Sequence, residues 1–115
     1  MNFEILKPDK NTIIFKLREK KLDATLSPEL KAEFLALCQS NVKRLIIDLS
    51  QVEYCDSSGL SSLLFCERRM RENKGDVTLV GVTDKVLSLM KIARLDPLFK
   101  IAPSIDEALD SKTKK

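Results

Sequence analysis

The most constraining feature of the sequence is a short apolar run that is followed by a polar turn and a long amphipathic segment. Residues 45–49 read Leu-Ile-Ile-Asp-Leu, with little of the polar alternation that marks a half-exposed strand. Such a run predicts a strand that is covered on both faces. After a short extension over residues 52–55, the tetrad Asp56-Ser57-Ser58-Gly59 precedes apolar residues at helical spacing, which end at Asn73-Lys74-Gly75. The chain is therefore predicted to contain a central strand, a polar turn and a crossing helix.

The segments before this run predict a hairpin and a helix. Residues 11–17 are rich in β-branched and aromatic side chains, and residues 3–6 are expected to pair with them across a turn at residues 7–10. Ser27-Pro28-Glu29 combines a capping hydroxyl, a proline suited to the first helical turn and an acid in that turn. A helix is therefore expected to begin at Ser27 and to pack one apolar stripe against the sheet. This stripe comprises Leu30, Phe34, Leu37 and Cys38.

The segments after the central helix continue the alternation. Residues 77–80 predict another strand, and Thr83-Asp84 is expected to cap a helix that Pro97 ends. Residues 98–102 fit a short edge strand, and the spacing of Ser104 and Glu107 is that of a capping box. Strands that alternate with helices imply right-handed crossovers and a mostly parallel sheet, which the opening hairpin makes mixed. The expected fold class is therefore α/β, with roughly four to five strands and about four helices.

The length of the chain fits one compact domain. With 115 residues, of which 43% are hydrophobic, the chain can bury an ordinary core of Leu, Ile and Val. We assign residues 1–110 to this domain. Residues 111–115 are basic and contain no apolar side chain to anchor them, so they are expected to form a flexible tail.

The charge pattern argues against nucleic acid and membrane partners. The net charge is only +3, and much of this excess lies in the basic tail, whereas duplex binding requires a broad basic face. Residues 68–74 hold a basic cluster, but acids are interleaved with it and no aromatic residue accompanies it, which is typical of a solvated helix face. No apolar run approaches the roughly 18 residues of a membrane span, and the start lacks the pattern of a signal peptide. A cytoplasmic location is expected.

The sequence lacks histidine and the common catalytic motifs. The chain has no histidine, which removes the commonest general base near neutral pH and any Ser-His-Asp triad. Cys38, Cys55 and Cys66 lack the spacing of zinc ligands, so buried reduced thiols are expected, without a metal or other cofactor. The few glycines form neither a Walker loop nor a dinucleotide turn. The chain is not expected to be an enzyme, and the remaining enzymatic alternative is a hydrolase that uses Ser58 with a lysine.

The tetrad Asp56-Ser57-Ser58-Gly59 admits two interpretations. In the structural one, Asp56 or Ser57 caps the helix, Ser58 fills the first turn and Gly59 permits tight packing. The other predicted helices, however, are capped by a single hydroxyl or acid, whereas this one begins with three polar residues and a glycine. This excess indicates a second role for the tetrad, and the local pattern alone leaves both interpretations open.

The stretch over residues 52–60, Val-Glu-Tyr-Cys-Asp-Ser-Ser-Gly-Leu, resembles the signature of STAS domains, specifically of bacterial anti-sigma factor antagonists. The resemblance covers nearly the whole chain, from about Asn11 to Leu109. Further matching segments occur in the expected order, namely Leu22-Asp23, residues 45–50, Lys74-Gly75, residues 77–81 and residues 98–109. The chain departs from the family at Lys20-Lys21, where a glycine is common, and at Cys55, where a larger aliphatic residue is common.

The resemblance implies a phosphorylation-controlled binding switch. In this family the unmodified antagonist binds an anti-sigma factor that is also a serine kinase, which releases the sigma factor. The kinase then phosphorylates the antagonist, and a phosphatase of the PP2C type resets the cycle. Carried onto this sequence, Ser58 is the phosphoacceptor, and Asp23, Asp56, Ser57 and Gly59 support the site. A monomer is expected. The alternatives are a STAS regulator whose output is not a sigma factor and a STAS subunit of a transport complex.

Overall fold

The computed structural model describes residues 1–110 and has a mixed five-stranded sheet at its centre, in the order β1-β2-β4-β6-β7. The tail predicted over residues 111–115 lies outside the described residues. The strands of this sheet are β1 (Phe3–Asp9), β2 (Thr12–Leu17), β4 (Arg44–Asp48), β6 (Asp76–Val80) and β7 (Lys100–Ala102). A separate two-stranded sheet joins β3 (Lys21–Leu22) to β5 (Tyr54–Cys55).

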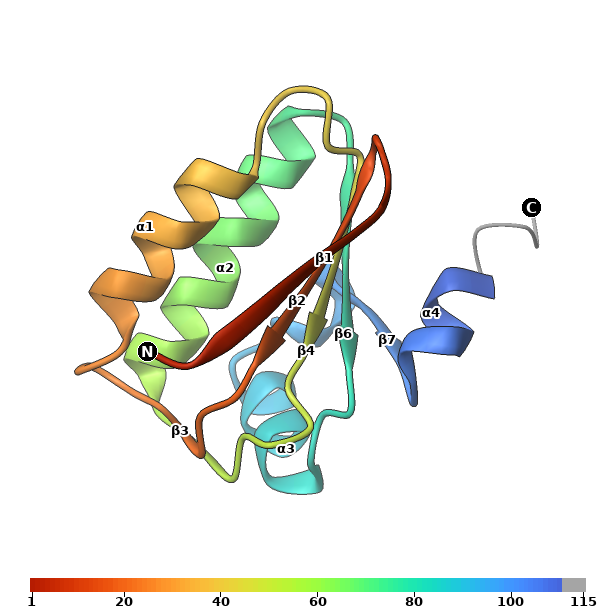
Figure 1. Cartoon of the computed structure of the whole chain (residues 1–115). Coiled ribbons are helices and arrows are strands. Elements are labelled where there is room, and N and C mark those ends of the chain that lie inside the picture. The colour runs from red at the N-terminus through yellow and green to blue at the C-terminus, as the bar shows by residue number, and fades with distance from the viewer. Residues whose placement is uncertain (111–115) are drawn as a thin grey trace.

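The helices connect these strands in the predicted α/β alternation. They are α1 (Ser27–Leu37), α2 (Ser57–Glu72), α3 (Asp84–Ile92), the short 3-10 helix η1 (Asp96–Leu98) and α4 (Ile105–Asp110). Figure 1 shows α1 and α2 side by side on one face of the sheet and α4 on the other side. Strands β1 and β2 pair antiparallel, and every other neighbouring pair in the sheet is parallel. The mixed, mostly parallel sheet is therefore confirmed.

Strand β4 lies in the middle of the sheet, as its apolar run predicts. Leu45, Ile46 and Ile47 are fully buried. Leu45 and Ile47 belong to the large core beneath α1 and α2, whereas Ile46 belongs to a small cluster with Ile14, Val80 and Ala108. Because successive side chains of a strand point to opposite faces, burial on both faces removes the polar alternation from the sequence.

The small cluster is covered by α4, which a buried arginine holds in place. Arg44 of β4 donates hydrogen bonds to the carbonyl oxygens of Ala108 and Leu109, near the end of α4. At the start of α4, the Ser104 hydroxyl oxygen accepts the Glu107 N–H at 3.2 Å, which confirms the predicted cap. Arg44 thus fixes the end of the C-terminal helix to the sheet, and the Ser104 cap closes the start of the helix.

Several element boundaries differ from the prediction. Strand β1 runs to Asp9, so the turn expected over residues 7–10 is shorter and lies at Lys10 and Asn11. Helix α3 ends at Ile92, before Pro97, because Arg94 adopts a left-handed φ of 60° and the Leu95 N–H returns to the Met90 carbonyl at 2.9 Å. This is a Schellman termination, with arginine at the position that glycine usually occupies.

Candidate functional site

The tetrad is positioned by two very short strands. Strands β3 and β5 are parallel, and Leu22 lies opposite Cys55. Asp23 and Asp56 directly follow this pair, and the Asp56 N–H donates to the Leu22 carbonyl at 3.2 Å. Because the carboxyl ends of parallel strands meet at one edge, Asp23 and Asp56 come together at the head of α2. The sequence did not predict that β3 and β5 pair, because a strand of two residues is too short to show a hydrophobic period.

Gly59 allows α2 to approach β3. The residue is buried, and an added Cβ would lie 2.2 Å from the Leu22 carbonyl oxygen and 2.8 Å from Leu22 Cγ. Its φ is not in the left-handed region, so conformational freedom is not the reason for glycine here. The geometry supports the tight-packing interpretation of Gly59.

Asp56 is the N-cap of α2. Its backbone is extended, with φ −113° and ψ −173°, and its Oδ1 accepts the Gly59 N–H at 3.0 Å. Ser57 and Ser58 therefore occupy the first two helical positions, and Ser57 is not the cap. Since the carboxylate satisfies the capping requirement, neither serine hydroxyl is needed for it.

The Ser58 hydroxyl reaches solvent. Ser57 is exposed and Ser58 is half-buried. Ser58 Oγ accepts or donates no hydrogen bond within residues 1–110, and it is not among the buried side-chain atoms that lack a partner there, which are Arg69 Nε, Asp76 Oδ1 and Thr78 Oγ1. An unpaired polar atom that is not buried faces water. The hydroxyl is thus at least partly exposed at the head of α2.

The Ser58 backbone is held by two buried serines. Ser27 Oγ and Ser62 Oγ lie 2.6 Å apart, and each lies 3.2 Å from the Ser58 carbonyl oxygen. One hydroxyl donates to the other, so only one proton remains for the carbonyl, and the two arrangements are interchangeable. This network joins the first residue of α1 to the first turn of α2.

The same network corrects the prediction for α1. The helix begins at Ser27, as expected, but its N-cap position is Leu26, and no side chain caps it. The Ser27 hydroxyl instead points inward toward α2. Sequence reasoning missed Ser27 and Ser62 as neighbours of the site because 35 residues separate them in the chain.

Asp23 adds a negative charge beside the tetrad. Its Oδ1 accepts hydrogen bonds from the Thr25 hydroxyl at 2.7 Å and from the Thr25 N–H at 3.1 Å. The Thr25 hydroxyl is the main reason that the pKa of Asp23 lies below its usual value. Asp23 is therefore ionised at neutral pH.

The three cysteines are buried. Cys38, Cys55 and Cys66 are all buried and free, which confirms the prediction. Burial, assisted by the charge of Asp56, raises the pKa of Cys55 to about 11, so its thiol stays protonated near neutral pH. Within residues 1–110, no group of three or more Cys, Asp or Glu side chains is arranged to hold a metal ion.

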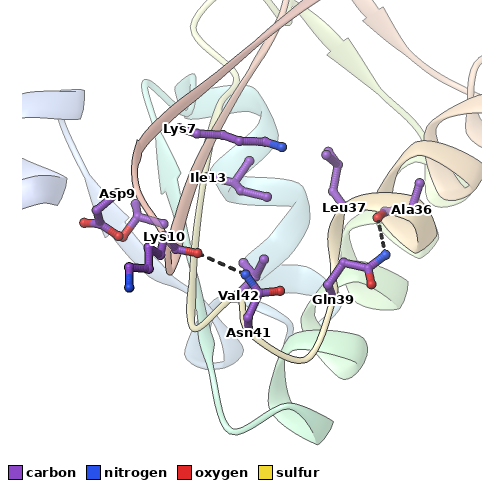
Figure 2. Close-up of a pocket in the computed structure, with 10 residues that line it drawn as sticks. Lys7, Asp9, Lys10, Ile13, Ala36, Leu37, Gln39, Asn41 and Val42 are labelled. Carbon is purple, nitrogen blue, oxygen red and sulfur yellow. Dashed lines mark hydrogen bonds between the residues drawn. The ribbon is translucent and has the colours of Figure 1, made fainter.

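A cavity of about 120 Å³ lies at the opposite end of the sheet, between the β1–β2 hairpin and the loop after α1. Figure 2 shows that its polar side chains bond to its own walls: Asn41 donates to the Lys10 carbonyl at 3.1 Å, and Gln39 donates to the Ala36 carbonyl at 2.8 Å. The Asn41 bond connects the loop to the hairpin, whereas the Gln39 bond connects the loop to the end of α1. The cavity therefore lies where the hairpin meets the loop after α1, away from the tetrad.

The helices carry two features that concern possible nucleic acid and membrane partners: the basic residues of α2 and the length of each helix. Arg68 and Arg71 are exposed, and Arg71 pairs with Glu67 at 2.9 Å, as on an ordinary solvated helix face. Within residues 1–110, every helix is too short or too polar to cross a bilayer.

The fold places the chain among small α/β domains with a mixed sheet. Residues 4–108 match the family model of the STAS domain, and the chain belongs to this family. It is similar to the anti-sigma-B factor antagonist of Staphylococcus aureus, with 26% identity over 81 residues, which cover 70% of this chain and 75% of that protein.

Two solved structures show how widely the fold is used. The phosphorylated form of the Bacillus cell fate determinant SpoIIAA matches with a TM-score of 0.75 at 21% identity, over 96% of this chain and 98% of that one. The murine anion transporter Slc26a9 matches with a TM-score of 0.77 at 18% identity, over 95% of this chain but only 19% of the transporter. These likenesses establish the fold, which serves both kinds of protein.

Proposed function

We propose that this chain is an anti-sigma factor antagonist, whose unmodified form binds an anti-sigma factor with serine kinase activity and thereby releases a sigma factor. Phosphorylation of Ser58 ends this binding, and a phosphatase of the PP2C type restores it. The observation that carries the proposal is the Ser58 hydroxyl, which faces solvent without a partner in residues 1–110 at the head of α2. The Staphylococcus aureus relative supports the same role.

The head of α2 can accept a phosphate without unfolding. Among the described residues, the N–H groups of Ser57 and Ser58 make no hydrogen bond, because Asp56 takes only the Gly59 and Leu60 N–H groups. Free N–H groups and the helix dipole favour an anion at this position. The fold is therefore expected to survive the modification, and the change is expected at the partner interface.

Electrostatic repulsion explains how a single phosphate on Ser58 makes the chain release its partner. The phosphate adds about −1.5 to −2 charge units at neutral pH. It adds them beside Asp56 and the ionised Asp23, on a surface that binds the partner through a neutral hydroxyl. Like charges brought together in an interface cost several kcal/mol, and a penalty of about 3 kcal/mol weakens binding by about a hundredfold.

The test is a kinase reaction with matched serine variants. The wild-type chain, Ser57→Ala and Ser58→Ala are each incubated with ATP, Mg²⁺ and purified anti-sigma factor kinases of the source organism, and the modified residue is mapped by mass spectrometry. We expect phosphate on the wild-type chain and on Ser57→Ala, and none on Ser58→Ala. Phosphate on Ser57 with Ser58 unmodified would overturn the assignment.

The transport role is the second candidate, because the Slc26a9 match shows that a segment of this fold occurs in a transporter. Affinity capture with Ser58→Ala as bait separates the two roles. An anti-sigma factor kinase in the captured material supports the antagonist role, whereas transporter subunits support the alternative. A kinase without any sigma factor in its pathway indicates a regulator with another output.

A further inference from the structure

The strand that leads to the tetrad carries an exposed aromatic side chain. Tyr54 lies on β5 and is 52% exposed, the only exposed aromatic residue within residues 1–110. Aromatic side chains contribute large contact areas and are enriched in the centres of protein interfaces. Tyr54 precedes Ser58 by four residue steps, which span at most about 14 Å of chain. Tyr54 and the Ser58 hydroxyl therefore belong to one region of the surface.

Helix α3 extends this apolar region. Tyr54, Lys85 and Leu89 line the same hollow between β5 and α3. Residues 85, 89 and 92 follow the i, i+4, i+7 spacing of one helix flank, so Ile92 lies along the same side as Leu89. Ile92 is 79% exposed, the highest value among the exposed large hydrophobic residues. We refer to Tyr54, Leu89 and Ile92 as the β5–α3 surface.

Lysines border the β5–α3 surface. Lys21 lies opposite Tyr54 in the parallel pairing of β3 with β5, and Lys85 shares the hollow with Tyr54. Both are exposed, and neither forms an ion pair within residues 1–110. Lys91 and Arg94 flank Ile92, the exposed acids nearby are Glu53 and Asp84, and the half-buried Asp23 and Asp56 lie toward the tetrad. Since exposed cations outnumber exposed acids here, a complementary partner presents an apolar groove with an acidic rim.

The size of a protein interface connects this surface to the tetrad. A standard interface covers about 800 Å² on each partner, which corresponds to a patch roughly 30 Å across. A protein that docks over Ser58 is therefore large enough to reach Tyr54 as well. A second copy of the chain is a poorer fit, because two exposed apolar side chains and the half-buried Leu89 supply at most a few hundred Å², far below the roughly 2,000 Å² or more of obligate homodimers.

We propose that the β5–α3 surface is a docking site for the anti-sigma factor kinase, with Tyr54 as its main anchor and the lysines as its charged border. This inference rests on the proposed function. The site supplies affinity that does not depend on the Ser58 hydroxyl, so it brings the kinase to its target and selects among related kinases. It also gives a role to Lys21, where the chain departs from the family.

The test compares exposed apolar residues in two places on the surface, with Leu35 matched to Tyr54 in exposure. Tyr54→Ala and Ile92→Ala remove the β5–α3 surface, and Leu35→Ala, which removes a 50% exposed side chain from α1, is the matched control. Dissociation constants of the unphosphorylated variants are measured by calorimetry with the purified kinase that modifies Ser58. We expect binding to weaken about 10- to 30-fold for Tyr54→Ala and about 3- to 10-fold for Ile92→Ala. Leu35→Ala is expected to change it by less than about twofold.

A charge-reversal variant tests the role of the lysines that border the β5–α3 surface. Lys21→Glu combined with Lys85→Glu is expected to weaken binding at low salt, and to lose most of that defect as salt rises, because exposed charges are screened. Thermal unfolding of every variant is recorded first, so that only folded proteins are compared.

The outcomes separate this inference from the proposed function. If Ser58 is phosphorylated and all four variants bind like the wild-type chain, the docking site is wrong and the switch stands. If light scattering shows a dimer that Ile92→Ala dissociates, a second copy occupies the surface and the inference is overturned. If no anti-sigma factor kinase binds the wild-type chain, both proposals fail together.

Discussion

The starts of α1 and α2 lie side by side and use serine in opposite ways (Figure 1). At the start of α1, Ser27 is buried, and its hydroxyl lies 2.6 Å from Ser62 Oγ. At the start of α2, Ser57 is exposed, Ser58 reaches solvent, and Asp56 provides the cap. A serine at a helix start therefore does not reveal by itself whether its hydroxyl is displayed.

The difference has a local cause. In α1, Pro28 has no N–H, and the Ser27 N–H bonds to the Asp23 carbonyl at 2.9 Å, so few free donors remain for a capping side chain. The Ser27 hydroxyl is free to turn into the core. In α2, the Asp56 carboxylate takes the Gly59 N–H, so the serine hydroxyls that follow it are not needed as caps. The following predictions test this contrast.

The largest effect is expected at Gly59. Gly59→Ala places a methyl group 2.2 Å from the Leu22 backbone oxygen, which cannot move without disturbing β3. We expect a loss of about 3 kcal/mol in the free energy of unfolding, measured by urea denaturation. Ser57→Ala is the control and should change it by less than about 0.5 kcal/mol. A Gly59→Ala protein as stable as the wild type would refute the close approach of α2 to β3.

The second largest effect on stability is expected at the buried hydroxyl pair of Ser27 and Ser62. Ser27→Ala and Ser62→Ala each remove the bond between the two hydroxyls, while the remaining hydroxyl can still donate to the Ser58 carbonyl, so each is expected to cost about 1.5 kcal/mol. The double variant should lose clearly less than the sum of the single losses, because the two hydroxyls satisfy one another. Urea denaturation of the four proteins in this cycle measures the coupling. Additive losses would show that the hydroxyls do not act as a pair.

The third largest effect on stability is expected at Asp56, the N-cap of α2. Asp56→Ala removes the acceptor of the Gly59 N–H and should lower the free energy of unfolding by about 1 kcal/mol. Asp56→Asn keeps a side-chain acceptor and should retain most of the stability. An equal loss in both variants would indicate that the charge of Asp56, and not the capping bond, stabilises the helix.

The smallest effect on stability is expected at the displayed hydroxyl. Ser58→Ala and Ser58→Asp should each change the free energy of unfolding by less than about 0.5 kcal/mol, because Ser58 Oγ makes no hydrogen bond within residues 1–110. Their thermal unfolding curves should overlay that of the wild-type chain. A loss as large as that of Ser27→Ala would show that Ser58 is a structural residue like its neighbour in α1.

The sequence predicts the framework of the fold better than the geometry of the site. The central strand and the amphipathic helices follow from local patterns, because burial on one or two faces leaves a readable period. The β3–β5 pair leaves none, and it is this pair that brings Asp23 next to Asp56. The Ser27–Ser62 contact depends on how α1 packs on α2, which no local pattern encodes.

The end of α3 shows a second kind of limit. Pro97 is a strong stop signal, yet the helix ends earlier because Arg94 adopts a left-handed conformation. Glycine usually occupies such a position, so an arginine there gives no signal in the sequence. For the tetrad, the pattern predicts a capped helix start, which the structure shows at Asp56. The accessibility of the Ser58 hydroxyl became clear only from the packing around it.

The most direct test of the central claim measures how phosphorylation of Ser58 changes partner binding. The chain is phosphorylated to completion by its kinase, and the affinities of the modified and unmodified forms for that kinase are compared by calorimetry, with circular dichroism as the control for folding. We predict that binding weakens by about a hundredfold or more while the fold is retained. Equal affinities of two folded forms would contradict the switch.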